Sequence, residues 1–150
     1  MSQSLTQIYI HLVYSTKLRH RWLDSEIRSE LFAYKAVILK NRKSPAILIN
    51  GVEDHVHLLF RQHKGQTIEA LTRDLKSESA KWLKKSCDGF EDFAWQGGYG
   101  VFSVSSSNLD GVREYIARQE RHHRTITFQE ELRRLLDKHG VEYDERYLWD

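Results

Sequence analysis

The sequence predicts an α+β fold built on one antiparallel sheet, and three observations support this. Segments with alternating apolar residues, typical of strands, are interspersed with segments whose apolar residues recur at helical spacing. The first six segments come in the order strand, helix, strand, strand, helix, strand. This is the order of the ferredoxin-like and RNA-recognition split β-α-β sheets. No linker or repeat interrupts the 150 residues, so a single domain is expected over 1–150.

The first half of the chain predicts one helix among three strands. Alternation in the first segment sets His11 on the strand face opposite Ile10 and Leu12. Asp24 stands where an N-cap is expected for the first helix. The predicted elements are a strand at 5–15, a helix at 24–41, and strands at 44–54 and 55–62.

The second half predicts a helix, a glycine-interrupted strand and two more helices. Thr127 and Glu130 form a capping box, which marks the start of the last helix, and Gly140 marks its end. One face of the sheet is left free for a ligand, an extra helix or a partner subunit. The predicted elements are a helix from Thr67, a strand at 93–105, a helix from Ser107 or Asn108 to about His123, and a helix from Thr127 to Gly140.

Composition favours a cytoplasmic protein. No apolar run reaches the roughly 18 to 20 residues needed to cross a membrane, and the N-terminus lacks the pattern of a signal peptide. Cys87 is the single cysteine, so an intrachain disulfide and a multi-cysteine zinc site are excluded. The net charge is +2, with basic residues clustered at 73–85 and 112–124. Such clusters contact phosphates in some proteins and form ordinary solvated helix faces in others.

The segment "EDHVHLLF" carries two histidines inside an apolar run. Since a strand has a period of two, His55 and His57 point to the same face, while Val56 and Leu58 point into the core. Two imidazoles spaced in this way can converge on one cation, although a third ligand is then needed from elsewhere. Two histidines on the free face of a sheet, with no metal, remain the alternative.

The helix expected at 108–123 offers further candidates. Tyr115 and Gln119 are four residues apart, so they are neighbours on one helix face. Two imidazoles and an amide oxygen can hold Mg²⁺ or Mn²⁺ with positions left open for phosphate oxygens. A tyrosine beside such a site can attack phosphorus and form a phosphotyrosine. A tyrosine at the rim of the core and a solvated glutamine are the plain alternatives.

Three motifs together resemble the single-tyrosine HUH transposases of the insertion sequence 200/605 group, the IS200-like transposase family. "GVEDHVHLLF" is similar to the family's histidine–hydrophobic–histidine strand, "QGGYGVFSVS" to its glycine-rich fourth strand, and "VREYIARQERHH" to its nucleophile helix. The resemblance covers residues 3–124, which it implies are the core of the domain. Residues 125–150 are expected to form an additional helix and a tail, in which seven acidic side chains outnumber four basic ones.

The resemblance implies an activity and a set of site residues. It implies that His55, His57 and Gln119 hold Mg²⁺ or Mn²⁺ and that Tyr115 is the catalytic nucleophile. Single-stranded DNA would be cleaved at hairpin-bearing element ends, leaving a 5′-phosphotyrosine and a free 3′-OH for strand transfer. The family also implies a homodimer, in which the histidines and the tyrosine of one active site can come from different subunits.

Residues for DNA contact are proposed from charge and aromatic character. Cationic side chains can contact backbone phosphates, and aromatic ones can stack on unpaired bases. Packing and solvated helix faces are the alternatives for all of them. The candidates are Arg118, Arg121, His122, Lys81, Lys84 and Trp95.

Two further functions stay open. One is a domesticated relative, resembling the repeat-associated tyrosine transposases, that acts on chromosomal palindromes. The other is a non-catalytic nucleic-acid-binding module of the RNA-recognition type, which needs aromatic residues on its central strands. The third strand carries His55 and His57 instead, which argues against the binding module. DNA beside the gene would separate the first alternative from a mobile element.

Overall fold

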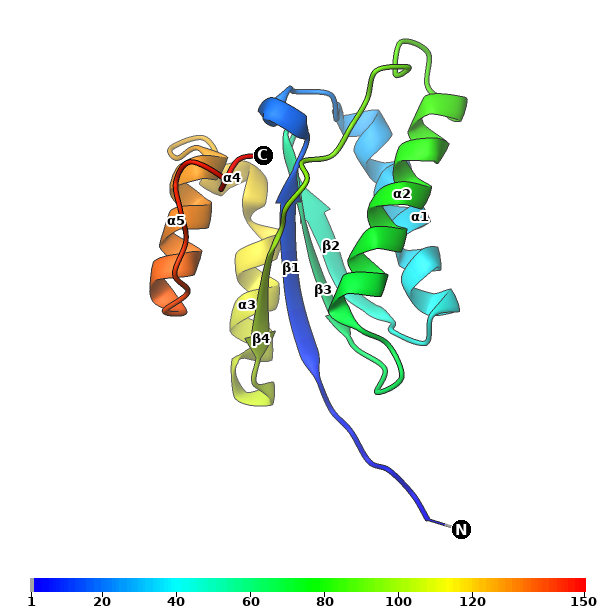
Figure 1. Ribbon diagram of the computed structural model, residues 1–150, viewed down its shortest axis with the longest axis vertical. Coiled ribbons are helices and arrows are strands. Elements are labelled where there is room, and N and C mark those ends of the chain that lie inside the picture. Colours follow the sequence, from blue (N-terminus) through cyan, green and yellow to red (C-terminus); the bar gives the residue numbers. More distant parts are fainter. Residues whose placement is uncertain (1) are drawn as a thin grey trace.

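The computed structural model describes residues 2–150 and shows a sheet with helices on both faces (Figure 1). The strands are β1 (Tyr9–Ser15), β2 (Ala46–Gly51), β3 (His55–Arg61) and β4 (Gly100–Val104). The helices are α1 (Ser25–Asn41), α2 (Ile68–Ser86), α3 (Leu109–Ala117), α4 (Gln119–His122) and α5 (Phe128–Lys138), with short 3-10 turns at Lys17–Arg19 and Ser106–Asn108.

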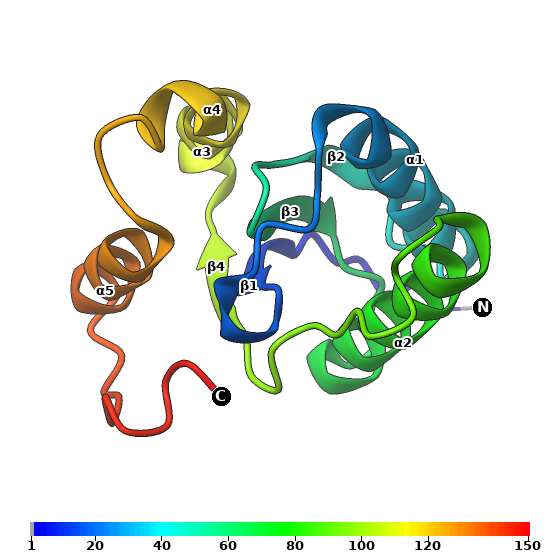
Figure 2. The ribbon, with the colours of Figure 1, turned by 90° about the horizontal axis from the view of Figure 1, so that it is seen from above.

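The sheet has the strand order β2-β3-β1-β4, and all three strand pairs are antiparallel. This confirms the predicted split β-α-β architecture. Helices α1 and α2 cover one face, and α3, α4 and α5 lie on the other (Figures 1 and 2). The face left free in the prediction is therefore covered by the chain's own C-terminal helices. Within residues 2–150, no helix is both long and apolar enough to cross a membrane.

Alternation along the strands builds a separate core on each face. The larger one lies between the sheet and helices α1 and α2, and it takes Leu12 from β1 and Leu58 from β3. The smaller one holds α5 against β1 and β4. Its buried members are Val13, Phe102, Phe128, Leu132 and Leu136. The apolar side of α5 thus packs on the sheet, and this packing places polar side chains of the first turn of α5 close to β3.

The predicted N-caps Asp24 and Thr127 are confirmed, and Thr67 caps the helix that it was predicted to begin; Asn108, at the predicted start of the helix that follows β4, makes no side-chain cap hydrogen bond. The side chains of Asp24, Thr67 and Thr127 accept hydrogen bonds from backbone N–H groups at the starts of α1, α2 and α5. For α5 the N–H of Glu130 donates to the hydroxyl of Thr127 over 3.2 Å. Each cap satisfies a donor that the first helical turn leaves unpaired. Gly140, with φ +66°, follows α5 as predicted.

Four predicted elements differ from the structure in their bounds. The first strand begins at Tyr9 and not at residue 5, and the second spans Ala46–Gly51 and not 44–54. The fourth strand is confined to Gly100–Val104, because the backbone N–H groups of Gly97 and Gly98 donate to the carbonyl of Asp150 and not to the sheet. The helix expected to run to His123 is broken at Arg118 into α3 and α4. At this break the side-chain amide of Asn50 donates to the carbonyl of Ile116 over 2.8 Å. Asn50 thereby takes an acceptor that a continuous helix would use.

Lys35 is fully buried beneath the sheet, in the larger core. Its amine donates hydrogen bonds to the hydroxyls of Tyr14 and Ser79 and lies 4.4 Å from the centre of the Trp95 ring. Burial, and secondarily the charge of Lys76, lowers the pKa of Lys35 well below its usual value. A lysine that stays neutral in the folded state and is charged in the unfolded state makes stability depend on pH.

We therefore expect stability to rise with pH through the range between the lowered pKa of Lys35 and its ordinary value of 10.5. In that range the unfolded chain binds a proton that the folded chain does not, so raising the pH favours folding. Lys76, whose pKa burial lowers to about 8, contributes in the same direction. Urea midpoints measured between pH 7 and pH 9.5 should rise less in Lys35→Met than in the wild type. The exposed Lys84→Met is the matched control, and an equal slope in Lys35→Met would contradict the assignment.

Candidate metal and nucleophile site

The two histidines of β3 lie on the face covered by α5, and both are fully buried. Their neighbours Val56 and Leu58 pack in the opposite core, which confirms the predicted orientation of the strand. The position is fixed by the sheet, because β3 is a central strand paired with β1 and β2 on its two sides. A burial of this kind requires that every ring nitrogen find a partner.

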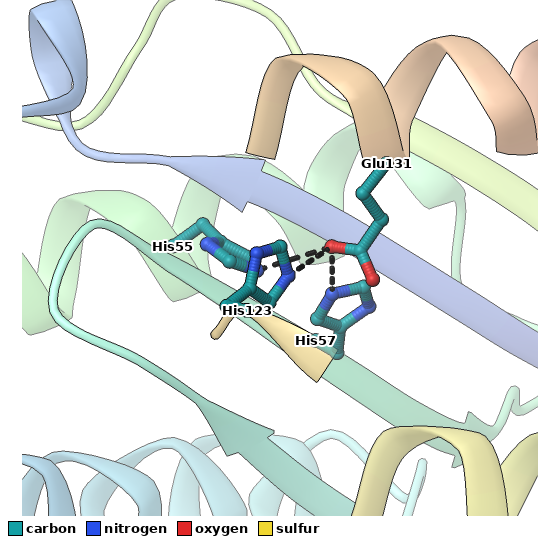
Figure 3. A group of neighbouring side chains, drawn as sticks. All are labelled: His55, His57, His123 and Glu131. Carbon is teal, nitrogen blue, oxygen red and sulfur yellow. Dashed lines mark hydrogen bonds and ion pairs between the residues drawn. The ribbon is translucent and has the colours of Figure 1, made fainter. Parts of the chain in front are cut away.

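A single carboxylate meets both histidines. One oxygen of Glu131, Oε1, lies 3.2 Å from Nε2 of His55, 3.0 Å from Nε2 of His57 and 2.8 Å from Nε2 of His123 (Figure 3). Glu131 comes from the first turn of α5 and is 1% exposed. Three imidazole nitrogens and a carboxylate from three elements of the fold therefore converge at one point.

The second oxygen of Glu131 faces the predicted nucleophile. The hydroxyl of Tyr115 donates to Oε2, and the amide of Gln119 donates to the same atom over 2.9 Å. The amide oxygen of Gln119 lies 3.1 Å from Nε2 of His55. Although Tyr115 and Gln119 belong to different helices, they still share a face, and one chain holds both of them beside the histidine pair.

Each histidine also has a partner on its other ring nitrogen. Nδ1 of His55 is 2.7 Å from a carboxylate oxygen of Asp54, and Nδ1 of His123 is 2.9 Å from the carbonyl of Ile126. Nδ1 of His57 is 2.7 Å from Nε2 of His11, which lies on β1. Metal-binding histidines commonly have outer contacts of this kind, which fix the ring and its tautomer. The donor set therefore fits a divalent cation.

The charges in the cluster shift its pKa values in opposite directions. Burial alone would raise the pKa of Glu131, but the charge of His57 and hydrogen bonds from the histidines hold it far below its usual range. Burial also acts to lower the pKa of His55, yet hydrogen bonds to Asp54 and Glu131 raise it to about 9. Burial and the charge of Glu131 raise the pKa of Tyr115. Without a bound cation, the Glu131 carboxylate thus faces a protonated His55, and Tyr115 remains a neutral phenol.

A groove of about 450 Å³ opens beside Tyr115, between β4, α3 and α5. Phe102 and Leu135 provide apolar surface in it, and three side chains of α5 and its C-terminal end provide basic groups. These are Arg134, Lys138 and His139. Tyr115, His122 and Glu131 also line the groove, so it borders the cluster.

The structure separates the predicted DNA-contact residues into three groups. His122 lies in the cluster, with its ring 5.4 Å from that of Tyr115 and its Nε2 3.5 Å from Glu131. Arg118 and Arg121 are exposed, Arg118 at the break between α3 and α4 and Arg121 within α4. Lys81 and Lys84 are exposed on α2, across the sheet from the histidine pair.

The position of Trp95 does not fit its predicted role in stacking on DNA bases. It is 8% exposed and packs in the larger core against Tyr14 and Phe93. Its indole N–H donates to the hydroxyl of Ser79 over 3.0 Å. With both the ring and its polar atom engaged inside the core, Trp95 is not available to stack on a base.

Sequence reasoning missed Glu131 and His123 as members of the cluster. For His11 the sequence left open a plain structural role, DNA contact or support of the metal site, and the structure places it against His57. A signal for Glu131 was present. On α5 it lies three residues after Phe128 and directly before Leu132, within the apolar stripe that packs on the sheet. A carboxylate in such a stripe is rarely buried without a charged partner. His123 had no comparable signal, since its place depends on the turn between α4 and α5.

Comparisons with known proteins agree with this fold. A family model described as "Transposase IS200 like" matches residues 4–119. The ISDra2 transposase TnpA of Deinococcus radiodurans is 26% identical over 118 residues, covering 75% of this chain and 84% of that protein. This chain therefore belongs to the IS200-like transposase family.

Two solved structures share the architecture. A crystal structure from Deinococcus radiodurans R1, described as that of a transposase, gives a TM-score of 0.63 at 23% identity and covers 79% of this chain and 98% of its own. The structure of a REP-associated tyrosine transposase bound to a REP hairpin gives a TM-score of 0.58 at 14% identity, covering 82% and 74%.

Proposed function

We propose that this protein cuts and rejoins single-stranded DNA at hairpin-bearing ends through a covalent 5′-phosphotyrosine on Tyr115. One observation carries the proposal: the Tyr115 hydroxyl lies against a buried cluster of histidines and one carboxylate, all within a single chain. Membership of the IS200-like transposase family supports it. The reaction acts on DNA in the cytoplasm, at the nucleoid.

In the proposed reaction the Tyr115 oxygen attacks the scissile phosphorus. The phosphate stays bonded to O5′ of the downstream strand and becomes a phosphotyrosine. The P–O3′ bond breaks, and the leaving O3′ takes up a proton. The Tyr115 hydroxyl donates to Oε2 of Glu131, so the proton leaves past this carboxylate as the bond to phosphorus forms. Rejoining reverses the step with a second 3′-OH, so no external energy source is consumed.

His55, His57 and Gln119 would hold a divalent cation, Mg²⁺ or Mn²⁺ in the prediction from sequence. Such an ion polarises the scissile phosphate and stabilises the charge that develops on it. Hydrogen bonds within the protein position the other groups. Asp54 and His11 fix the rings of His55 and His57, and Gln119 donates to the Glu131 carboxylate that faces Tyr115.

The groove beside Tyr115 fits the unpaired strand next to the scissile phosphate. Its apolar walls suit a base, and Arg134 and Lys138 suit backbone phosphates, as in other grooves that bind single strands. Arg118, Arg121 and His122 lie near the same end of the site and are proposed for the hairpin. A homodimer is also proposed, although one chain holds both parts of the catalytic cluster.

A domesticated protein acting on chromosomal palindromes is the second candidate. It is favoured by the likeness in fold to a REP-associated transposase bound to a REP hairpin. The two candidates share the chemistry at Tyr115 and differ in the DNA that they cleave. Palindromes that flank the gene on both sides as element ends would favour the mobile element.

The test is a denaturing gel of the protein mixed with single-stranded hairpin DNA taken from the flanks of its gene, with and without divalent metal. We expect a metal-dependent band that migrates as protein joined to the downstream strand, together with a released strand ending in 3′-OH. Double-stranded DNA of the same sequence is the control and should give no adduct. Cleavage without any covalent adduct would contradict the proposal.

A further inference from the structure

The histidines of the cluster have more acceptors around them than N–H groups to satisfy them. A neutral imidazole carries one N–H and one lone pair. For His55, Nδ1 faces the carboxylate of Asp54, and Nε2 faces oxygens of both Gln119 and Glu131. Exchanging the amide N and O of Gln119 would not help, since Glu131 would still be an acceptor. His55 therefore has an acceptor on each side.

His123 has the same mismatch. Its Nδ1 is 2.9 Å from the carbonyl oxygen of Ile126, which can only accept, so the proton lies on Nδ1. Its Nε2 then points a lone pair at Oε1 of Glu131 from 2.8 Å. With Glu131 ionised, protein groups alone relieve both mismatches only if both rings carry positive charge, and the centroids of His55 and His123 are 4.4 Å apart. Two like charges so close and out of water are costly.

A cation bound by the Nε2 atoms removes the mismatch without charging the rings. The lone pairs then become ligands, and the N–H groups at Nδ1 donate to Asp54 and Ile126, in the manner of metal-bound histidines. Ligand atoms from His55, His57, His123 and Glu131 all lie within 4.8 Å of one another. Two ligands on opposite sides of an ion with bonds of about 2.1 Å are about 4.2 Å apart, so only small side-chain rotations are needed.

We propose that His123 and Glu131 complete a four-ligand metal centre with His55 and His57, and that this centre takes a transition metal such as Zn²⁺ or Mn²⁺ in preference to Mg²⁺. Three imidazole nitrogens with one carboxylate suit such metals, whereas Mg²⁺ prefers oxygen ligands and retains water. Gln119, the third ligand in the prediction from sequence, is here replaced as a ligand by His123 and Glu131. Its amide donates to Glu131, so it acts as a positioning residue that orients the carboxylate.

The inference deepens the proposed function. Metal binding by these four residues does not depend on that function, but the role of the metal in DNA cleavage rests on it. It makes α5 a part of the catalytic centre. Through its two oxygens Glu131 joins the metal ligands to the Tyr115 hydroxyl, so the helix that supplies one ligand also fixes the nucleophile.

Metal binding can be measured without DNA, by calorimetric titration of the full chain after chelator treatment. We expect one Zn²⁺ per chain, with Mg²⁺ binding at least 100-fold more weakly. Glu131→Gln and His123→Ala should each weaken Zn²⁺ binding by 100-fold or more, while Gln119→Ala weakens it by no more than about tenfold, as expected for an outer partner. Glu130→Gln and His20→Ala, both exposed, are the matched controls and should bind like the wild type.

Co²⁺ gives a second measurement, because its absorption spectrum reports its ligands. The wild-type spectrum should change in Glu131→Gln and stay unchanged in Glu130→Gln, and circular dichroism verifies that each variant is folded. The inference is overturned if Zn²⁺ binds no more tightly than Mg²⁺, or if Glu131→Gln binds like the wild type. If Zn²⁺ binds as expected but no DNA adduct forms, the proposed function fails and the metal centre stands.

Discussion

Tyr115→Phe is expected to abolish the covalent DNA adduct while hairpin binding stays within about twofold of the wild type. The change removes only the hydroxyl, which is the attacking group in the proposed reaction. The ring keeps its neighbours, since its centroid lies 6.0 Å from that of His57 and 6.3 Å from that of His11. Oε2 of Glu131 keeps the hydrogen bond from Gln119. The lost hydrogen bond should cost about 0.5–1.5 kcal/mol of stability, which leaves the fold intact.

The measurement is the adduct band on a denaturing gel, with filter binding of the same hairpin alongside. Tyr147→Phe is the matched control, since Tyr147 is 65% exposed and far along the chain from the cluster. It should form the adduct at the wild-type rate. If Tyr115→Phe still forms an adduct, another side chain is the nucleophile.

His57→Ala is expected to abolish cleavage as well, for a different reason. His57 lies between Glu131, at 3.0 Å, and His11, at 2.7 Å. Its loss removes a proposed metal ligand and takes from the buried His11 its partner at Nε2, while Glu131 keeps its contacts with His55 and His123. A buried polar group left unpaired costs about 1–3 kcal/mol. A domain of ordinary stability, about 5–15 kcal/mol, tolerates this loss. Circular dichroism should be unchanged, and the melting temperature should fall by several degrees.

Normal cleavage by folded His57→Ala would contradict the ligand assignment. His20→Ala is the control for loss of a histidine, since His20 is exposed and outside the cluster. It should cleave and melt like the wild type.

Mixing the two inactive variants tests which chain supplies each part. Because one chain holds both Tyr115 and His57, a mixture of Tyr115→Phe and His57→Ala should remain inactive. Activity restored by mixing would show that the active site is assembled between two subunits, as the sequence resemblance allowed.

Much of the fold follows from local patterns. The strand period set His55 and His57 on one face, and the caps at Asp24, Thr67 and Thr127 fixed where helices begin. These features depend on neighbouring residues, so the sequence carries them directly. The break at Arg118 depends instead on Asn50, a residue of another element, and no local pattern reports it.

The candidate site also has parts that local sequence patterns predict and parts that depend on long-range packing. Tyr115 and Gln119 could be paired from their spacing, and the structure brings both to the histidine pair. Glu131 reaches that pair only because α5 folds back over β1 and β4, a long-range packing event. Counted from sequence as one of seven acidic side chains of the tail, Glu131 has its buried carboxylate at the centre of the cluster.

The position of Glu131 has a consequence for how this chain can be divided. The segment that matches the family model ends at residue 119, twelve residues before the carboxylate. A protein trimmed to that segment would keep His55, His57 and Tyr115, yet would lose Glu131 and expose Val13 and Phe102. The matched segment thus contains the histidine pair and the predicted nucleophile, whereas the carboxylate that joins them comes from the residues that follow it.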